Sequence, residues 1–107
     1  MILQKIRKLL GIGVDTETDY KTLVDAGAHI IDVRTPAEFS AGHIPNSVNI
    51  PLTHLTKKIT RLAKDRQIIL CCASGMRSAS GRDSLISMGY LHVHNGGSWS
   101  RLMNRLK

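Results

Sequence analysis

Two short apolar runs constrain the fold of this chain more than any other feature of its sequence. Residues 29–33 and 67–71 consist mostly of Ile, Leu and Val, as is typical of strands that are buried on both faces. Segments with helical signals alternate with these runs along the chain. This alternation predicts an α/β fold in which a parallel sheet is covered by helices on both faces.

The clearest helix start lies directly after the first of these strands. Thr35 is a typical N-cap residue, Pro36 takes the first helical position, and Glu38 completes a capping box. Gly42 then ends a short helix. The sequence therefore predicts a sharp turn from the strand into this helix.

The remaining elements are weaker but follow the same alternation. Asn95-Gly96-Gly97 is typical of a turn, and Ser98 is expected to cap the last helix. Further strands are expected at 47–50 and 91–94, and further helices at 19–26, 53–63 and 77–88.

The length of 107 residues suits a single domain with one core. It excludes enzymes that bind a dinucleotide in one domain and a substrate in another. We expect an N-terminal amphipathic helix and hinge at 1–14, followed by the domain at 15–107. Residues 1–10 carry a helical apolar stripe with basic residues between. This stripe is expected to pack on its own domain or on a dimer partner, and contact with a membrane surface is the minor alternative.

Fifteen Lys and Arg residues against eight Asp and Glu residues give a formal net charge of +7. Such a charge favours anionic partners. Aromatic residues make up only 4% of the chain, which argues against nucleic-acid binding by base stacking. Basic residues gather at 57–66 and near the C-terminus, where a solvated helix face is the ordinary explanation.

The two cysteines, Cys71 and Cys72, are adjacent. Neighbouring residues of a strand point to opposite faces, so an ordinary structural disulfide between them is not expected. The chain has no disulfide framework, which fits a reducing compartment and a cytoplasmic location.

Cys72 is the candidate nucleophile, because it stands between a buried strand and a helix start. Unpaired backbone N–H groups and the helix dipole there stabilise a thiolate, which is the reactive form of cysteine. Gly75 allows the loop to curl around the sulfur, and Arg77 can hold an anion beside it. Cys71 lies within the apolar strand and is expected to pack as a small inert hydrophobe.

Several motifs together resemble the rhodanese family of single-domain sulfurtransferases. The resemblance covers roughly residues 15–104 and rests on segments 32–39, 42–51 and 72–78, with Gly96-Gly97 followed by Trp99. It implies a three-layer fold with about five mainly parallel strands. It also implies that Cys72 carries a persulfide, with the loop as substrate cradle and two supporting residues at the end of the first strand. The cradle residues are Ala73, Ser74, Gly75, Met76, Arg77 and Ser78, and the supporting residues are Asp32 and Arg34.

The implied reaction is a double displacement. The Cys72 thiolate takes the outer sulfur of an anionic donor such as thiosulfate, and a thiol, a protein or cyanide then accepts it. No metal or organic cofactor is needed. Only Arg77 in the loop is charged, so thiosulfate is expected to be a poor donor compared with a persulfide.

Two alternatives stay open at this point. The domain could be a regulatory or protein-binding module that has kept the fold without turnover. It could also be a phosphatase-like or arsenate-reducing enzyme, although related phosphatases have five residues between Cys and Arg. Here four residues separate Cys72 from Arg77, and the smaller ring suits sulfur better than phosphate.

Overall fold

The structure is a computed structural model that describes residues 17–107. The helix and hinge expected at 1–14 lie outside the described residues. The helices are α2 (Tyr20–Asp25), α3 (Pro36–Ala41), α4 (Leu55–Lys58), α5 (Met76–Ser87) and α6 (Trp99–Arg105), with 3-10 turns at Leu52–His54 and Ile59–Arg61. The strands are β1 (His29–Asp32), β2 (Val48–Asn49), β3 (Gln67–Cys72) and β4 (His92–Ser98).

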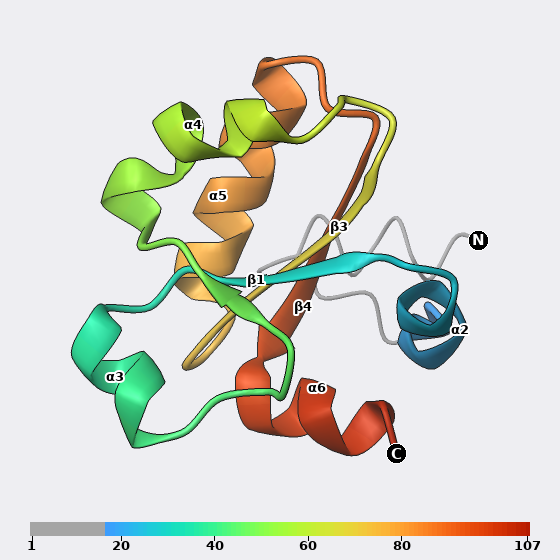
Figure 1. Ribbon diagram of the computed structural model, residues 1–107, viewed down its shortest axis with the longest axis vertical. Coiled ribbons are helices and arrows are strands. Elements are labelled where there is room, and N and C mark those ends of the chain that lie inside the picture. The colour runs from blue at the N-terminus through green and yellow to red at the C-terminus, as the bar shows by residue number, and fades with distance from the viewer. Residues whose placement is uncertain (1–16) are drawn as a thin grey trace.

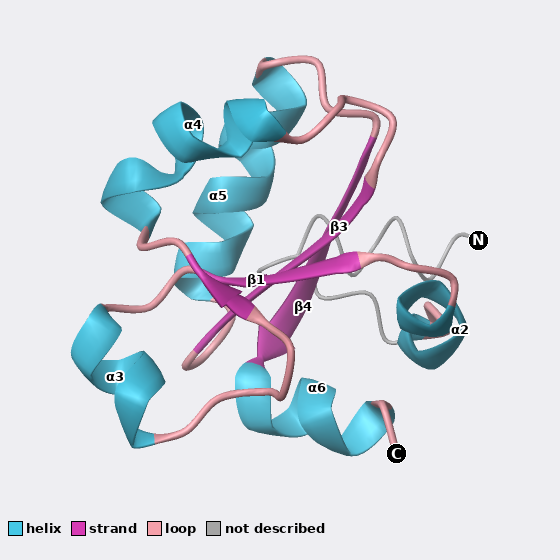
Figure 2. Ribbon diagram, in the orientation of Figure 1, coloured by secondary structure: helices cyan, strands magenta, loops and turns pink. Residues whose placement is uncertain are grey.

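The strands form one parallel sheet in the order β2-β1-β3-β4. This confirms the α/β class, but residues 17–107 form four strands instead of the expected five. The fifth strand was implied by the family resemblance alone, since the sequence of these residues holds only four strand-like segments. The crossovers place helices on both faces, with α4 and α5 on one side of the sheet and α2 and α6 on the other (Figure 2).

Each face of the sheet has its own apolar core. β3 contributes to both, because its side chains alternate between the faces. One core lies beneath α4 and α5 and contains Ile68, Leu70 and Cys72 of β3, and the other lies beneath α2 and α6 and contains Ile69 and Cys71. Among the described residues, no helix combines the length and apolarity needed to cross a membrane.

The long helix expected at 53–63 is wrong, because the chain forms two 3-10 turns around the four-residue α4. The Tyr90 hydroxyl donates to the carbonyl oxygens of Ile59 (2.8 Å) and Leu62 (3.0 Å). The Thr60 hydroxyl donates to the carbonyl of Lys57. These hydroxyl groups bind backbone carbonyls of the segment that a regular helix would use for its own hydrogen bonds, and such competition weakens a regular helix.

The turn expected at 95–97 is also wrong, because these residues belong to β4. Asn95 pairs with Leu70 and Gly97 with Cys71, so Gly96 is one extra residue in the ladder. A Cβ atom at Gly96 would lie 2.9 Å from the Ile69 side chain and 2.8 Å from that of Leu102. The glycine therefore serves a bulge under close packing, which the Asn-Gly-Gly composition does not distinguish from a turn.

Candidate active site

The loop between β3 and α5 lies at the carboxyl end of the sheet, where α3 also lies (Figure 1). β3 ends at Cys72 and α5 begins at Met76, with Gly75 as its N-cap residue. Gly75 has a φ of 100°, in the left-handed region where side chains are strained. The sequence here can therefore turn from strand to helix within three residues, which directs the first N–H groups of α5 back toward the strand end.

Cys72 is fully buried at the base of this loop. Its Sγ accepts a hydrogen bond from the Gly75 N–H at 3.0 Å and lies 3.4 Å from Ser78 Oγ. Burial alone raises the pKa of the Cys72 thiol, but hydrogen bonds from the Ser78 hydroxyl and from backbone N–H groups of the loop lower it. The net pKa lies below the ordinary value, so the loop favours the thiolate.

Cys71 has the opposite environment, although it is the adjacent residue. It is fully buried in the core beneath α2 and α6. Burial, and then the neighbouring Asp32 carboxylate, raise the pKa of Cys71 far above its usual range. The expectation that Cys71 packs as an inert hydrophobe agrees with this environment.

Arg77, in the first turn of α5, is joined to α3 through Glu38. Its Nη1 lies 2.7 Å from Glu38 Oε1 and its Nη2 2.9 Å from Oε2. Glu38 also accepts from the Thr35 N–H while the Thr35 hydroxyl accepts from the Glu38 N–H, so the predicted capping box is confirmed. The Arg77 hydrogen bonds, followed by that from Thr35, lower the pKa of Glu38 to about 2.

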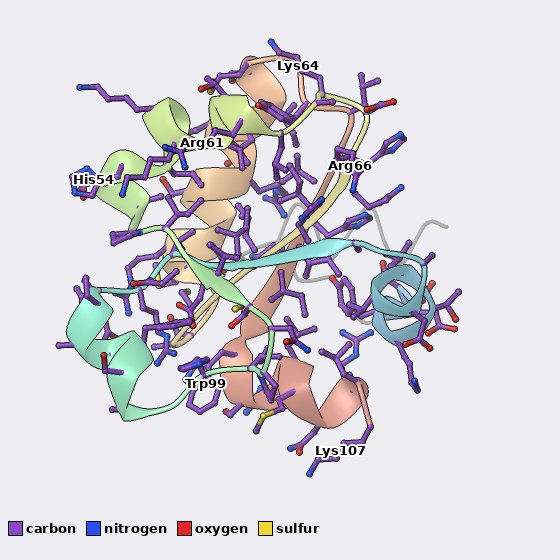
Figure 3. All side chains as sticks on the ribbon, viewed as in Figure 1. His54, Arg61, Lys64, Arg66, Trp99 and Lys107 are labelled. Atoms are coloured by element: carbon purple, nitrogen blue, oxygen red, sulfur yellow. The ribbon has the colours of Figure 1, made fainter. Side chains whose placement is uncertain are left out.

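Asp32 and Arg34 form a buried ion pair at the end of β1, with 2.7 Å between Nη2 and Oδ2. Arg34 also donates to the Gly42 carbonyl and stacks on the Trp99 ring, 4.8 Å from its centroid. Trp99 lies at the start of α6 near the chain that follows α3 (Figure 3). The pair therefore joins β1, the end of α3 and α6, and neither side chain is among the hydrogen-bond partners of Cys72 Sγ.

The structure divides the expected cradle residues, apart from the half-buried Arg77, into two groups. Gly75 and Ser78 are buried beside Cys72, whereas Ala73, Ser74 and Met76 are exposed. Met76 exposes 67% of its surface, so the outer side of the loop is in part apolar. Gly75, Ser78 and the Ser74 backbone provide hydrogen bonds to Sγ, while the side chains of the outer group are exposed to solvent.

Asn95 is a buried residue of the site that the sequence analysis missed. Its Oδ1 lies 2.6 Å from Ser78 Oγ and accepts from the Gly97 N–H, and its Nδ2 donates to the Gly75 carbonyl at 3.0 Å. Because Asn95 stands before two glycines, its sequence context indicated a turn. No local signal connected it to a loop twenty residues earlier.

The histidines do not gather into a metal site within residues 17–107, where no group of three or more potential ligands occurs. His43 stacks on Phe39 and donates to its carbonyl, and His94 lies 2.8 Å from Gln67 Oε1. A groove of about 900 Å³ beside β1 and β2 is lined mainly by apolar residues. None of the loop residues 72–78 lines it, so it is separate from Cys72.

Comparison with known proteins agrees with this fold. The profile of the rhodanese-like domain matches residues 16–100. A sulfurtransferase of Allochromatium vinosum is 33% identical over 93 residues, covering 82% of this chain and 87% of that protein. The thiosulfate sulfurtransferase PspE of Escherichia coli is 34% identical over 76 residues, covering 69% of this chain and 73% of that protein.

Solved structures show the same relationship. A rhodanese from E. coli superimposes with a TM-score of 0.66 at 33% identity, covering 69% of this chain and 89% of that one. The human single-domain sulfurtransferase TSTD1 shares the fold with a TM-score of 0.71 at 22% identity, covering 83% of this chain and 94% of that one. The chain belongs to the rhodanese-like domain family, whose members found here include sulfurtransferases.

Proposed function

We propose that this protein is a sulfurtransferase in which Cys72 carries sulfane sulfur as a persulfide. The observation that carries the proposal is the hydrogen bonding of Cys72 Sγ at the N-terminus of α5. There the Gly75 N–H donates to the sulfur at 3.0 Å, and the pKa of Cys72 is lowered despite its burial. A pre-ionised thiolate needs no general base to act as a nucleophile.

The reaction has two steps that conserve atoms and charge. The Cys72 thiolate attacks the terminal sulfur of the donor; a new S–S bond forms and the donor's own bond to that sulfur breaks. With thiosulfate, sulfite leaves with the electron pair. Cyanide or a thiolate then attacks the terminal sulfur of the persulfide, and Cys72 is released as a thiolate.

The loop N–H groups keep their role through both steps. The thiolate and the terminal sulfur of the persulfide are both anionic, and fixed donors stabilise such charge without reorganising. Cys72 is buried at the base of the loop, which favours a donor that presents a single terminal sulfur atom over a bulky phosphate ester.

The environment of Arg77 supports a persulfide donor over thiosulfate. Arg77 is the one charged residue of the segment 72–78, and Glu38 already binds its guanidinium at two points. A dianionic donor must therefore compete with a carboxylate for this group. A thiol-derived persulfide, whose reacting sulfur group carries a single negative charge, loses less by meeting a neutralised arginine.

The proposal is tested by the mass of Cys72 after donor treatment. The protein is incubated with thiosulfate and, separately, with glutathione persulfide, and its peptides are analysed without reductant. We expect one added sulfur atom on Cys72, removed by cyanide with release of thiocyanate, and the faster gain with the persulfide. Absence of added sulfur with both donors would leave a non-catalytic binding module as the better description.

A further inference from the structure

The side-chain amide of Asn95 has only one possible orientation. The Gly97 N–H can only donate and lies 3.0 Å from Oδ1, whereas the Gly75 carbonyl can only accept and lies 3.0 Å from Nδ2. Rotating the amide by half a turn would place Nδ2 against the Gly97 N–H, donor against donor, and Oδ1 against the Gly75 carbonyl, acceptor against acceptor. Asn95 Oδ1 therefore faces Ser78 as an acceptor.

The Ser78 hydroxyl has one proton and three neighbours. Asn95 Oδ1 at 2.6 Å and the Gly75 carbonyl at 3.2 Å only accept, whereas Cys72 Sγ at 3.4 Å accepts as a thiolate and can donate as a thiol. The closest contact is with Asn95. While the hydroxyl proton points to Asn95, Ser78 can accept from a Cys72 thiol but cannot donate to a thiolate.

We infer that Asn95 is a positioning residue that controls the charge state of Cys72 through the Ser78 hydroxyl. The Ser78 proton is donated to Asn95 while Cys72 is a thiol, and it rotates to Sγ when Cys72 becomes a thiolate. The inference deepens the proposed function, on which it rests in treating Cys72 as the reacting group. It assigns to β4 a part in chemistry otherwise confined to the loop.

The direction of the effect follows from competition for one proton. Asn95 Oδ1 withholds a donor from the thiolate, so loss of this acceptor frees the hydroxyl and lowers the pKa of Cys72. The Gly75 carbonyl still accepts from the Ala79 N–H when Asn95 is replaced. A purely structural Asn95 has the opposite effect, because a loosened loop aligns fewer N–H groups with Sγ and raises the pKa.

Other ionisable groups around Cys72 are held in fixed contacts. The Cys71 thiol on β3 is buried in the opposite core, and the Tyr20 hydroxyl on α2 donates to the Asn95 carbonyl. Two ion pairs lie nearby, one at the end of β1 and one between α3 and α5. The ion pairs are Asp32–Arg34 and Glu38–Arg77. The variants below leave all of these groups in place.

The test measures the pKa of Cys72 from the pH dependence of its alkylation by iodoacetamide, with the modified residue identified by peptide mass spectrometry. Asn95→Leu removes the acceptor at similar volume, and Asn95→Asp strengthens it. We expect Asn95→Leu to lower the pKa by about half a unit to one unit, the size of one hydrogen bond to a charged group shared between two acceptors. Asn95→Asp raises it. The exposed Asn104 on α6 provides the control, since Asn104→Leu leaves the pKa unchanged.

Each variant is repeated with Ser78→Ala, which separates this mechanism from a structural one. Without the hydroxyl, the Asn95→Leu shift disappears and the Asn95→Asp rise becomes smaller. A rise with Asn95→Leu, or shifts of equal size in both backgrounds, overturns the inference. If Asn95→Leu does not fold, the comparison of Asn95→Asp with and without Ser78→Ala decides, since equal rises in the pKa of Cys72 overturn the inference. Alkylation of Cys72 requires no turnover. A protein that gains no sulfur from donors would therefore refute the proposed function, while the alkylation pKa would still show whether Asn95 acts through Ser78.

Discussion

The guanidinium of Arg77 is bound at both of its terminal nitrogens by the Glu38 carboxylate, with distances of 2.7 and 2.9 Å. Glu38 belongs to the capping box of α3, while Arg77 belongs to the first turn of α5. The pair thus joins two helix starts that are 39 residues apart in the chain. It also neutralises the one charged side chain of the loop segment.

Releasing Arg77 is expected to improve thiosulfate as a donor. Glu38→Gln keeps the α3 cap, because a capping box accepts Gln at this position, but removes the carboxylate that binds Arg77. We expect kcat/KM for thiosulfate to rise about threefold to tenfold, as the freed guanidinium binds the anion. The rate with glutathione persulfide should change less.

Two controls accompany this measurement. Asp83→Asn removes one exposed negative charge from α5 and should leave both rates nearly unchanged. In the double variant Glu38→Gln with Arg77→Gln, the gain should vanish. A gain that survives loss of Arg77 contradicts the explanation.

The same pair should contribute to stability in a defined pH range. Arg77, and then Thr35, lower the pKa of Glu38 to about 2, against about 4.3 in an unfolded chain. The folded state therefore favours the carboxylate, and the contribution is complete above the unfolded pKa and is lost as the pH falls through about 2. We expect urea unfolding to show wild type more stable than Glu38→Gln near neutral pH.

The stability difference should shrink steadily between pH of about 4 and 2. In an Arg77→Gln background, the effect of Glu38→Gln should be small at every pH. A constant difference down to pH of about 2 would exclude titration of Glu38 as its cause.

The two cysteines should differ sharply in activity. Cys72→Ser is expected to abolish thiocyanate formation from cyanide, because it removes the sulfur that the loop N–H groups stabilise. Cys71→Ser should keep most of the activity, since its side chain lies in the opposite core. Circular dichroism confirms folding of both variants, and an equal loss in both would refute the assignment of a single nucleophile.

The basic surface is expected to act on encounter with anionic donors. Basic residues 57–66 lie in and after α4, and Figure 3 shows Arg61 and Lys64 on that side of the molecule. Raising salt from 0.1 M to 1 M shortens the Debye length from about 10 Å to about 3 Å. The second-order rate with thiosulfate should fall, while turnover at saturating donor should change much less.

Neutralising the side chains of Lys57, Lys58 and Arg61 together tests whether this field matters. At low salt the triple Gln variant should react more slowly with thiosulfate and show a weaker salt dependence. An unchanged second-order rate would mean that these residues serve solubility alone.

Gly96 should tolerate no side chain. A Cβ atom there would lie 2.8 Å from Leu102 Cδ2 and 3.1 Å from the Leu70 carbonyl oxygen. Gly96→Ala is expected to lower the free energy of unfolding by about 1–3 kcal/mol, as is usual for overpacking a core. Urea unfolding measures the change, with Ser80→Ala at an exposed site of α5 as control. Equal midpoints for the two variants would contradict the close packing.

Much of the fold could be predicted because its signals are local. The capping box of Thr35 and Glu38, and the apolar run of β3, depend only on residues within one element. The position of Cys72 at the junction of β3 and α5 followed from the same signals. The capping box is an interaction between residues three apart, and β3 is a run of consecutive residues, so the sequence displays both directly.

The parts that could not be predicted depend on contacts between distant segments. The binding of Arg77 by Glu38 and the approach of Asn95 to Ser78 both require the sheet to be assembled first. The breaks around α4 depend on the Tyr90 hydroxyl, which reaches Ile59 from 31 residues away. In each case a side chain from another element decides between conformations that the local sequence leaves nearly equal.

The placement of Cys71 and Cys72 on opposite faces of β3 has a consequence for oxidative damage. The chain holds two cysteines, and they contribute to cores on opposite sides of the sheet. Cys71 is therefore poorly placed to act as a resolving thiol for Cys72. A sulfenic acid on Cys72 must be reduced by a thiol from another molecule, and where none is present it proceeds to the irreversible sulfinic and sulfonic acids. Survival of the Cys72 thiol thus depends on the thiol supply around the protein.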